Sequence, residues 1–359
     1  MRKGLITLVG TYTSGESEGI YALELDPDSG AMRLLGLAAP ADHPSFLAAH
    51  PSADVVYAVS ELSTPDGDDG GILHVFSLDG KTGRLTLKER APTLGAWPCH
   101  VSLDPAGRFA MVANYLSGSV TTFALHPDGS LAGRRDHRRH QGSGPVADRQ
   151  DRPHPHAIQT DPFGRFALVP DLGADRLVVY RLDQELGKLL DHEPPYAQLH
   201  PGAGPRHIVF HPSGRFVYCI NELDSTVTAF RYDAETGALA PIETVSTLPR
   251  DFSGGSTCAE IQIHPTGRFL YGSNRGHDSI AVYRIDEASG SLTLLGHEPT
   301  QGRTPRHFSL APTGKILLAA NQESNSIVSF HVDQQTGLLT PTGHQIQIPD
   351  PACVIVFPD

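Results

Sequence analysis

The sequence predicts an all-β protein, a seven-bladed β-propeller of four-stranded antiparallel blades. Three observations lead to this prediction. A block of about 20 residues recurs along the 359-residue chain, each copy holds two apolar runs around a turn, and two further strand-like runs follow each copy. A period near 50 residues with four strands per unit is typical of a propeller.

The recurring block is clearest in GPRHIVFHPSGRFVYCINEL, which starts at Gly204. When the copies are aligned on their second residue, here called the anchor, a proline follows seven residues later in all seven. This constant proline predicts one turn geometry that repeats around a ring. The anchors are Pro44, Pro98, Pro155, Pro205, Cys258, Pro305 and Pro351, which lie 46 to 57 residues apart.

The outer two strands of each blade are predicted from the runs between copies. After Glu222 come TVTAFRYD, the turn AETG and ALAPIETV. The seventh copy supplies only an innermost strand, and the N-terminal runs LITLVG, GIYALELD and AMRLLG supply the other three. We therefore expect both chain ends to build one blade, which closes the ring and removes free sheet edges. Residues 1–359 are expected to form a single domain without helices of useful length.

Charge and cysteine content exclude several classes of partner. The chain carries 28 Lys and Arg against 40 Asp and Glu, a net charge of −12, which argues against nucleic acid as a partner. Four cysteines without a pairing pattern indicate a reducing compartment. No apolar run approaches transmembrane length, and the first one is too short for a signal peptide. We expect a soluble cytoplasmic protein, a monomer or weak homo-oligomer, with no membrane contact.

Two rings of residues are predicted to face the axis on one side of the propeller. Arg206 lies one residue after its anchor (position +1), where the innermost strand begins, and Glu222 lies at +17, where the second strand ends. The +1 ring is Ser45, Cys99, His156, Arg206, Ala259, Arg306 and Ala352. The +17 ring is Glu61, Tyr115, Leu172, Glu222, Arg275 and Gln322, with Thr11 as the rough equivalent from the N-terminus.

The chemistry of these rings points to an active site. Scaffold positions repeat one residue type, whereas the +1 and +17 positions vary between blades and carry charge; the +2 positions add His100, His207, Glu260 and His307. Converging His, Glu and Arg side chains in a central pocket are the default active-site hypothesis. Arginines suit an anionic, oxygen-rich ligand, and a neutral His exchanges protons near pH 7. The competing interpretation, an ion pair that only closes the hairpin, explains Arg206 and Glu222 but not His156 or Arg275.

The stretch GAGPRHIVFHP, followed by YCINELDSTV, resembles the lactonase family of seven-bladed propellers. That family includes bacterial 6-phosphogluconolactonase and the fungal carboxy-muconate lactonising enzyme. The resemblance extends over the whole chain and is strongest across residues 202–230. It implies a catalytic set of one His, one Glu and two Arg, which falls on His156, Arg206, Glu222 and Arg275.

The resemblance implies hydrolysis of a sugar δ-lactone, with 6-phosphoglucono-δ-lactone of the pentose phosphate pathway as the first candidate, and without cofactor or metal. Arg206 and Arg275 are expected to stabilise the oxyanion. The sequence leaves open whether His156 or Glu222 is the general base. A second group is expected to bind substrate: Arg306, His207, His307, Tyr115, His100, Glu61 and Gln322. Residues 132–155 are expected to form a long basic loop, in which Arg134, Arg135, Arg138 and Arg139 are alternative phosphate ligands; the competing and favoured interpretation is a solvated excursion of the chain.

Four other interpretations compete with the lactonase. A metal site at His154-Pro-His156 lacks a supporting cluster of ligands, and the proline is a poor scaffold for joint chelation. Cys99 beside His100 is a candidate nucleophile, but a small buried thiol is the favoured interpretation. A muconate-type cycloisomerase would use the same residues. A non-catalytic binding propeller would favour exposed aromatic residues, and the chain has one Trp.

Overall fold

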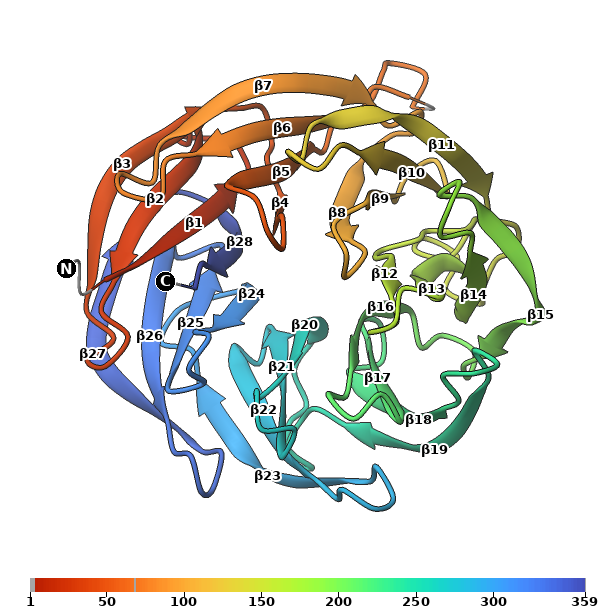
Figure 1. The fold of residues 1–359 in the computed structure, drawn as a ribbon. Helices are drawn as coiled ribbons and strands as arrows, with labels where there is room; N and C mark the ends of the chain where they lie inside the picture. The colour runs from red at the N-terminus through yellow and green to blue at the C-terminus, as the bar shows by residue number, and fades with distance from the viewer. Residues whose placement is uncertain (1–3, 68, 359) are drawn as a thin grey trace.

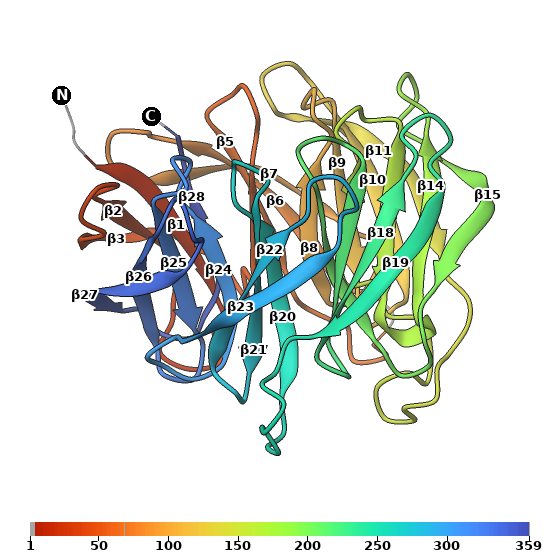
Figure 2. The ribbon, with the colours of Figure 1, turned by 90° about the horizontal axis from the view of Figure 1, so that it is seen from below.

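The computed structural model describes residues 4–67 and 69–358, which form seven four-stranded antiparallel sheets in a ring (Figure 1). Each sheet is a blade whose first strand lies near the axis and whose fourth strand lies at the rim. Seen edge-on, the inner strands run between the two faces of the ring (Figure 2). The predicted seven-bladed propeller is therefore confirmed.

Six blades each use four consecutive strands. From axis to rim they are β4 (Phe46–Ala49), β5 (Val55–Ser60), β6 (Ile72–Leu78) and β7 (Leu85–Pro92); β8 (Pro98–Leu103), β9 (Phe109–Asn114), β10 (Ser119–Leu125) and β11 (Leu131–Arg139); β12 (Gln159–Thr160), β13 (Phe166–Asp171), β14 (Arg176–Leu182) and β15 (Leu189–Gln198); β16 (Pro205–Phe210), β17 (Phe216–Asn221), β18 (Thr226–Tyr232) and β19 (Leu239–Ser246); β20 (Thr257–Ile263), β21 (Phe269–Arg275), β22 (Ser279–Ile285) and β23 (Leu292–Pro299); β24 (Pro305–Leu310), β25 (Ile316–Asn321), β26 (Ser326–Val332) and β27 (Leu339–Gln347).

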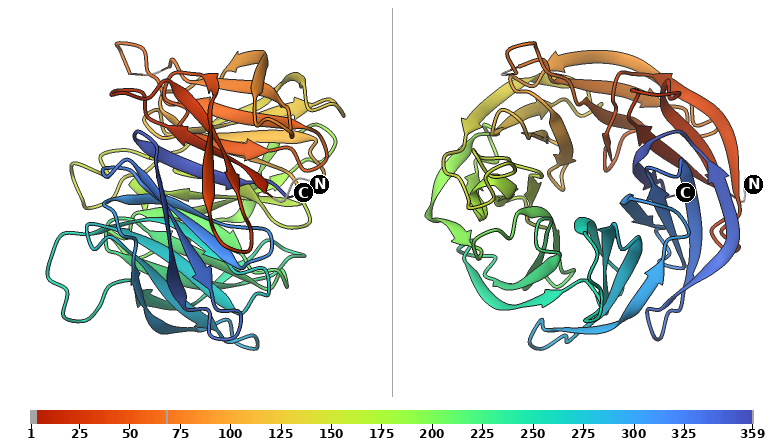
Figure 3. Two further views of the ribbon diagram at one scale, coloured as in Figure 1. Left: turned by 90° about the vertical axis from the view of Figure 1, so that its left-hand side faces the viewer. Right: turned by 180° about the vertical axis from the view of Figure 1, so that it is seen from behind.

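The closing blade joins both ends of the chain, as the sequence predicts. Its order is β28 (Pro351–Val356), β1 (Leu5–Thr11), β2 (Gly19–Leu25) and β3 (Met32–Pro40), so the C-terminal strand lies at the axis beside the N-terminal strand. The termini accordingly lie at the same blade in the opposite view (Figure 3). Main-chain hydrogen bonds between the ends complete the ring.

The core lies between blades, because each middle strand is covered on both faces by its neighbours. Every residue of β17 is buried, which is why FVYCIN is a continuous apolar run rather than an alternating one. Buried hydroxyls link adjacent blades: Tyr218 donates to the carbonyl of Gly290 at 2.9 Å, and Tyr271 to that of Gly337 at 2.9 Å. The same contact in successive blades explains how one packing solution repeats around the ring.

Several His-Pro turns carry a structural hydrogen bond. Nε2 of His211 lies 2.9 Å from the carbonyl oxygen of Gly267, and Nε2 of His264 lies 3.2 Å from that of Gly314. In both cases the accepting glycine belongs to the equivalent turn of the next blade. These histidines therefore join blades at the face opposite to the predicted active site.

The innermost strands share a β-bulge at the +1 position. The pairing of β16 with β17 shifts between Pro205 and His207, so Arg206 is the extra residue. The same shift makes Cys99 and Arg306 the extra residues of β8 and β24. A bulge re-aims a side chain and interrupts the alternation of faces. The +1 and +2 side chains therefore both reach the axis, but they line different cavities.

Candidate active site

The carboxylate of Glu222 lies at the centre of a cluster of three arginines. Its Oε2 contacts Nε of Arg206 at 3.0 Å and Nη2 of Arg275 at 2.9 Å, while Oε1 contacts Nη2 of Arg149 at 2.5 Å. Burial alone would raise the pKa of Glu222, but the charges of Arg275 and Arg206 outweigh burial and hold this pKa well below its usual value. Glu222 is therefore an ionised carboxylate at every physiological pH.

The three arginines approach Glu222 from different depths. Arg206 is buried beneath the carboxylate and also donates from Nη1 to the carbonyl of Ala259 at 2.8 Å. Arg275, at the end of β21, donates a second hydrogen bond to the carbonyl of Cys258 at 2.9 Å. Arg149 is partly exposed and comes from the loop before β12. The cluster thus joins three blades around one carboxylate.

His156 lines the same pocket with a neutral ring. Burial, followed by the charge of Arg206, lowers the pKa of His156 well below 6.5. Nδ1 lies 3.7 Å from the Cys99 sulfur, and within the described residues Nε2 has no hydrogen-bond partner. Burial raises the pKa of the Cys99 thiol, which keeps it protonated and makes it a poor nucleophile. The His156 imidazole is therefore neutral, whereas Glu222 in the same pocket is ionised.

Arg306 forms the opposite wall with Tyr12 and Glu61. Its Nη2 donates to the Tyr12 hydroxyl at 2.6 Å and its guanidinium lies 5.0 Å from the centre of that ring, while the hydroxyl donates to Glu61 at 2.7 Å. No carboxylate among the described residues lies within ion-pair distance of Arg306. Its positive charge is therefore available to an anionic ligand.

The pocket that these residues share has a volume of about 330 Å³, which suits a small molecule. The structure brings the predicted His156, Glu222 and Arg275 together in its lining, with Tyr115, Glu61 and Arg306, and places Arg206 directly beneath Glu222. Tyr115 stacks on His154 with ring centres 4.4 Å apart and stands edge-on to His156 at 5.5 Å. Gln322 and Leu172 are not among the lining residues.

Sequence reasoning missed three residues of this lining, namely Trp97, Thr257 and Arg149. Trp97 and Thr257 lie one residue before an anchor, at position −1. Trp97 and its equivalents His43, Thr304 and Asp350 have left-handed φ angles between 43° and 59°. Variation of residue type at this position, as at +1, was an available signal. Arg149 belongs to a loop without counterpart in other blades, and no repeat argument finds it.

The loop that presents Arg149 is anchored at the next residue. The buried Gln150 donates to the carbonyl of Leu172 at 2.8 Å and to Oδ1 of Asp175 at 2.7 Å. Asp175 in turn accepts from the backbone N–H groups of Gly202 and Gly204. Arg149 therefore reaches Glu222 from a well-ordered support.

Three expectations from the sequence need correction. Residues 132–139 are not part of a loop but belong to the rim strand β11, because they pair with β10; Arg134, Arg135, Arg138 and Arg139 thus lie far from the axis. The closing-blade equivalent of +17 is Tyr12 rather than Thr11. The backbone N–H of Tyr12 donates to the carbonyl of Asp350, just as the backbone N–H of Glu222 donates to the carbonyl of Gly204.

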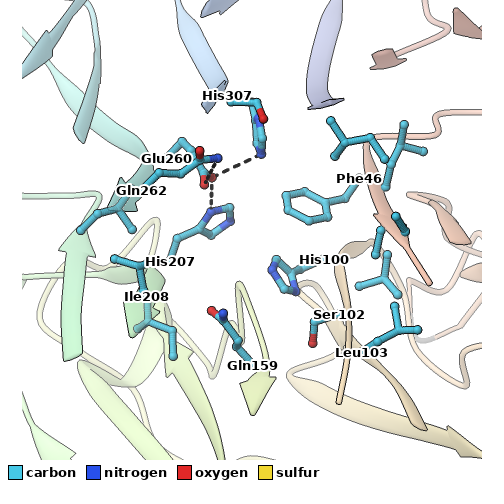
Figure 4. A pocket seen from close by; sticks show the side chains of 18 of the residues that line it. Phe46, His100, Ser102, Leu103, Gln159, His207, Ile208, Glu260, Gln262 and His307 are labelled. Atoms are coloured by element: carbon cyan, nitrogen blue, oxygen red, sulfur yellow. Dashed lines mark hydrogen bonds and ion pairs between the residues drawn. The ribbon is translucent and has the colours of Figure 1, made fainter. Parts of the chain in front are cut away.

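The third correction concerns the +2 residues, which do not share the active-site pocket. His100, His207 and His307 line a second cavity of about 450 Å³ with Glu260, Gln262 and Phe46 (Figure 4), here called the far-side chamber. The bulge at +1 is the reason, because it turns +1 and +2 toward different levels of the axis. His207 and His307 come near the active-site pocket only at a small void, which they line together with Arg206 and Arg306.

Other features of the described residues bear on competing functions. No group of three or more His, Cys, Asp or Glu side chains in the described part of the chain is arranged to hold a metal ion. The four cysteines are free and buried. No helix of the described residues is long and apolar enough to cross a membrane.

Comparison with known proteins places the chain in a family. Residues 6–356 match the family model described as lactonase, 7-bladed beta-propeller. The chain is 38% identical over 302 residues to a 6-phosphogluconolactonase of Bacillus subtilis, covering 84% of this chain and 83% of the relative. It is 32% identical over 306 residues to a 6-phosphogluconolactonase of Formosa agariphila, covering 83% and 84%.

A solved structure shows the same architecture. The periplasmic gluconolactonase of Pseudomonas aeruginosa superposes with a TM-score of 0.91 at 32% identity, covering 98% of this chain and 99% of the other. The match extends over the whole ring, including the blade that both termini build. The sequence and structural matches together show that this chain belongs to the lactonase family of seven-bladed β-propellers.

Proposed function

We propose that this protein hydrolyses 6-phosphoglucono-δ-lactone to 6-phosphogluconate, with His156 as the proton-exchanging group. The observation that carries the proposal is a neutral imidazole beside an arginine–carboxylate cluster in a pocket with one unpaired arginine. The names of the relatives from Bacillus and Formosa support the same substrate. The geometry favours specific roles, which follow one by one.

His156 is a better base than Glu222. A carboxylate whose pKa is held far below its usual value binds a proton weakly, so Glu222 cannot remove one efficiently from water. His156 is neutral at the working pH and has a free Nε2. In the proposed reaction it takes a proton from the attacking water. The resulting imidazolium, acidified by the same surroundings, returns that proton to the ring oxygen that leaves.

Arg275 and Arg206 supply the positive charge for the oxyanion. Attack of water on the lactone carbonyl places a negative charge on its oxygen, and fixed guanidinium groups stabilise that charge without reorganisation. Both arginines are already oriented by Glu222, at 2.9 and 3.0 Å. The proposed role of Glu222 is thus to hold the two arginines together at fixed positions against their mutual repulsion.

Arg306 is proposed to bind the phosphate of the substrate. Guanidinium groups pair with phosphate through two parallel hydrogen bonds, and Arg306 has no carboxylate partner among the described residues to exchange for the ligand. Arg149, at the mouth of the pocket, adds a second positive charge. Tyr115 and Trp97 supply aromatic surface for the sugar, and Glu61 holds Arg306 through Tyr12.

A phosphate-free sugar lactone is a second candidate substrate, because the Pseudomonas neighbour is named a gluconolactonase. The test is pH-stat hydrolysis of 6-phosphoglucono-δ-lactone and of glucono-δ-lactone, in the presence of a chelator, by the wild type and His156→Gln. We expect fast turnover of the phosphorylated lactone that the variant loses. Equal turnover of both lactones would assign a general sugar lactonase. Turnover of neither above the spontaneous rate would overturn the proposal in favour of a muconate-type reaction or a binding propeller.

We also propose that the enzyme works in the cytoplasm. Four free thiols suit a reducing compartment. Cell fractionation with a periplasmic and a cytoplasmic marker tests this placement, and recovery in the periplasmic fraction would contradict it.

A further inference from the structure

A chain of hydrogen bonds runs from Arg206 into the far-side chamber. Nη1 of Arg206 lies 3.3 Å from Nε2 of His207, and Nδ1 of His207 lies 2.7 Å from Oε2 of Glu260. All three side chains are buried. Figure 4 shows His207 and Glu260 facing each other in the chamber wall, with His307 on the other side of the carboxylate. The mechanism above does not use either His207 or Glu260.

The direction of this chain follows from the first link. A guanidinium only donates, so Nε2 of His207 accepts and its proton is on Nδ1. Nδ1–H then donates to Glu260. Burial raises the pKa of Glu260 to about 8, with Arg206 opposing this rise, and because Nε2 of His207 accepts from Arg206, Nδ1–H faces Oε2 of Glu260 at 2.7 Å. Glu260 thus selects the tautomer of His207 that accepts from Arg206.

Glu260 is itself held from two further sides. Gln262 donates from Nε2 to Oε1 at 3.3 Å, and the orientation of this amide is set because its own Oε1 accepts from the N–H of Leu310 at 3.0 Å. Nδ1 of His307 accepts from the N–H of Val354 at 3.4 Å, which leaves Nε2–H to face Glu260 at 3.5 Å. The carboxyl group of Glu260 therefore has a fixed position, and its hydrogen bond with His207 fixes the orientation of that ring.

The guanidinium of Arg206 is held at three points: Glu222 on Nε, and both the carbonyl of Ala259 and His207 on Nη1. The contacts to Glu222 and Ala259 alone leave the plane of the guanidinium free to tilt about the line that joins them. The third contact, to His207, prevents this tilt. An apolar plug would fill the axis equally well, since the +2 residues of three other blades are Phe46, Ala157 and Cys353, while His100 and His307 occupy this position in the remaining two. The polar pair occurs in the blade of Arg206 and in the next one.

We propose that His207 and Glu260 are positioning residues that fix the plane of the Arg206 guanidinium from the far-side chamber, so that its free N–H groups face the reacting carbonyl. This inference rests on the proposed function, because the oxyanion role of Arg206 does. It extends the set of residues that serve the active site into the far-side chamber.

The first test is a set of variants assayed on the lactone that the wild type hydrolyses. His207→Phe removes the acceptor for Arg206, and we expect kcat to fall about tenfold or more with KM changed by less than about twofold. His207→Gln keeps an oxygen acceptor near the position of Nε2 and is expected to recover part of this loss. Glu260→Leu should behave as His207→Phe does, and Glu260→Gln, which still accepts from His207, should lie near the wild type.

Gln159→Ala is the matched control, since Gln159 lines the same chamber and is not part of the chain of hydrogen bonds (Figure 4). Its kcat is expected to equal that of the wild type. A double-mutant cycle with Arg206→Lys separates positioning from general loss of structure. If His207 acts through Arg206, His207→Phe lowers kcat only slightly when Arg206 is already replaced by Lys. Unchanged kcat in His207→Phe, or losses that multiply in the cycle, would overturn the inference.

Failure of the proposed function is distinguished by a measurement that needs no substrate. We expect the Nε–H group of Arg206, bonded to Glu222, to give a slowly exchanging NMR signal, which Arg206→Lys identifies by its loss. We expect faster exchange of this signal in His207→Phe and wild-type exchange in Gln159→Ala. If the wild type hydrolyses no lactone but the exchange changes in this way, His207 does position Arg206, and only the proposed lactone hydrolysis is wrong. Unchanged exchange in a folded His207→Phe, or in Glu260→Leu if the former does not fold, overturns the positioning by His207 and Glu260.

Discussion

The axial channel holds two cavities that are built from neighbouring residues of the same strands but differ in charge. The active-site pocket contains Arg149, Arg275 and Arg306 in its lining and Arg206 beneath it. The far-side chamber contains no Lys or Arg in the lining that the structure describes; its titratable groups are histidines and acids. One end of the channel therefore attracts anions, while the other does not.

This difference teaches how a symmetric scaffold acquires a single site. Each blade offers the same positions, but the β-bulge separates +1 from +2, so that adjacent residues serve different cavities. Arg206 at +1 of one blade and Arg275 at +17 of the next then converge on the carboxylate of Glu222, where Arg149 joins them from an unrepeated loop. The fold by itself does not determine the function, which depends on the residues that occupy a few equivalent positions of the blades.

The largest expected effect comes from removing the charge at the centre of the pocket. Glu222→Gln leaves three guanidinium groups without their shared anion, and we expect kcat to fall about a hundredfold through misplaced arginines. The free energy of unfolding should fall by about 3 kcal/mol, as for other broken buried ion pairs. Steady-state kinetics and urea denaturation measure both. Glu323→Gln, at an exposed carboxylate, is the control, and equal behaviour of the two variants would contradict the importance of the cluster.

The second expected effect separates the two ends of the pocket itself. Arg306→Gln removes the unpaired charge, and KM for the phosphorylated lactone should rise about tenfold, the value of one lost charge-assisted interaction. Turnover of phosphate-free glucono-δ-lactone should stay as it was. If KM for both lactones rises equally, Arg306 contacts the lactone ring or the reacting carbonyl rather than the phosphate.

The pH dependence sharpens the contrast between His156 and an ordinary histidine. Burial and Arg206 lower the pKa of His156, so the neutral, basic form persists as the pH falls. We therefore expect kcat/KM to stay constant from about pH 8 down through about pH 6.5, the usual pKa of His, and to decline only at more acidic pH. A decline centred at or above the usual value would show that His156 is not the base, or that substrate raises its pKa.

The smallest expected effect tests whether polar atoms of the chamber outside the Arg206 chain have only a structural role. Ser102 donates to the carbonyl of Ile158 at 2.5 Å in the chamber wall. Ser102→Ala should lower the free energy of unfolding by about 1 kcal/mol, the usual value of one such hydrogen bond, with kcat unchanged. Thermal and urea denaturation measure the first, and steady-state assays the second. A lower kcat would extend the functional network beyond His207 and Glu260.

The sequence by itself determined the architecture and the first residues of the site. The constant proline and the spacing of the anchors predict seven blades, and the incomplete seventh copy predicts the closure by β28 and β1. These features are visible because every blade must satisfy the same turn geometry and packing, so the same residue pattern recurs many times along the chain. Positions that break the repeat, such as Arg206 and Glu222, stand out against it.

Only the tertiary structure decided how these residues are used. The bulges that direct His207 away from Arg206's pocket, the reach of Arg149 from an unrepeated loop, and the pairing of Tyr12 with Arg306 have no counterpart in sequence spacing. The physical reason is that these contacts join different blades at the axis. Their distances depend on how seven sheets close into a ring, which no single stretch of the chain encodes.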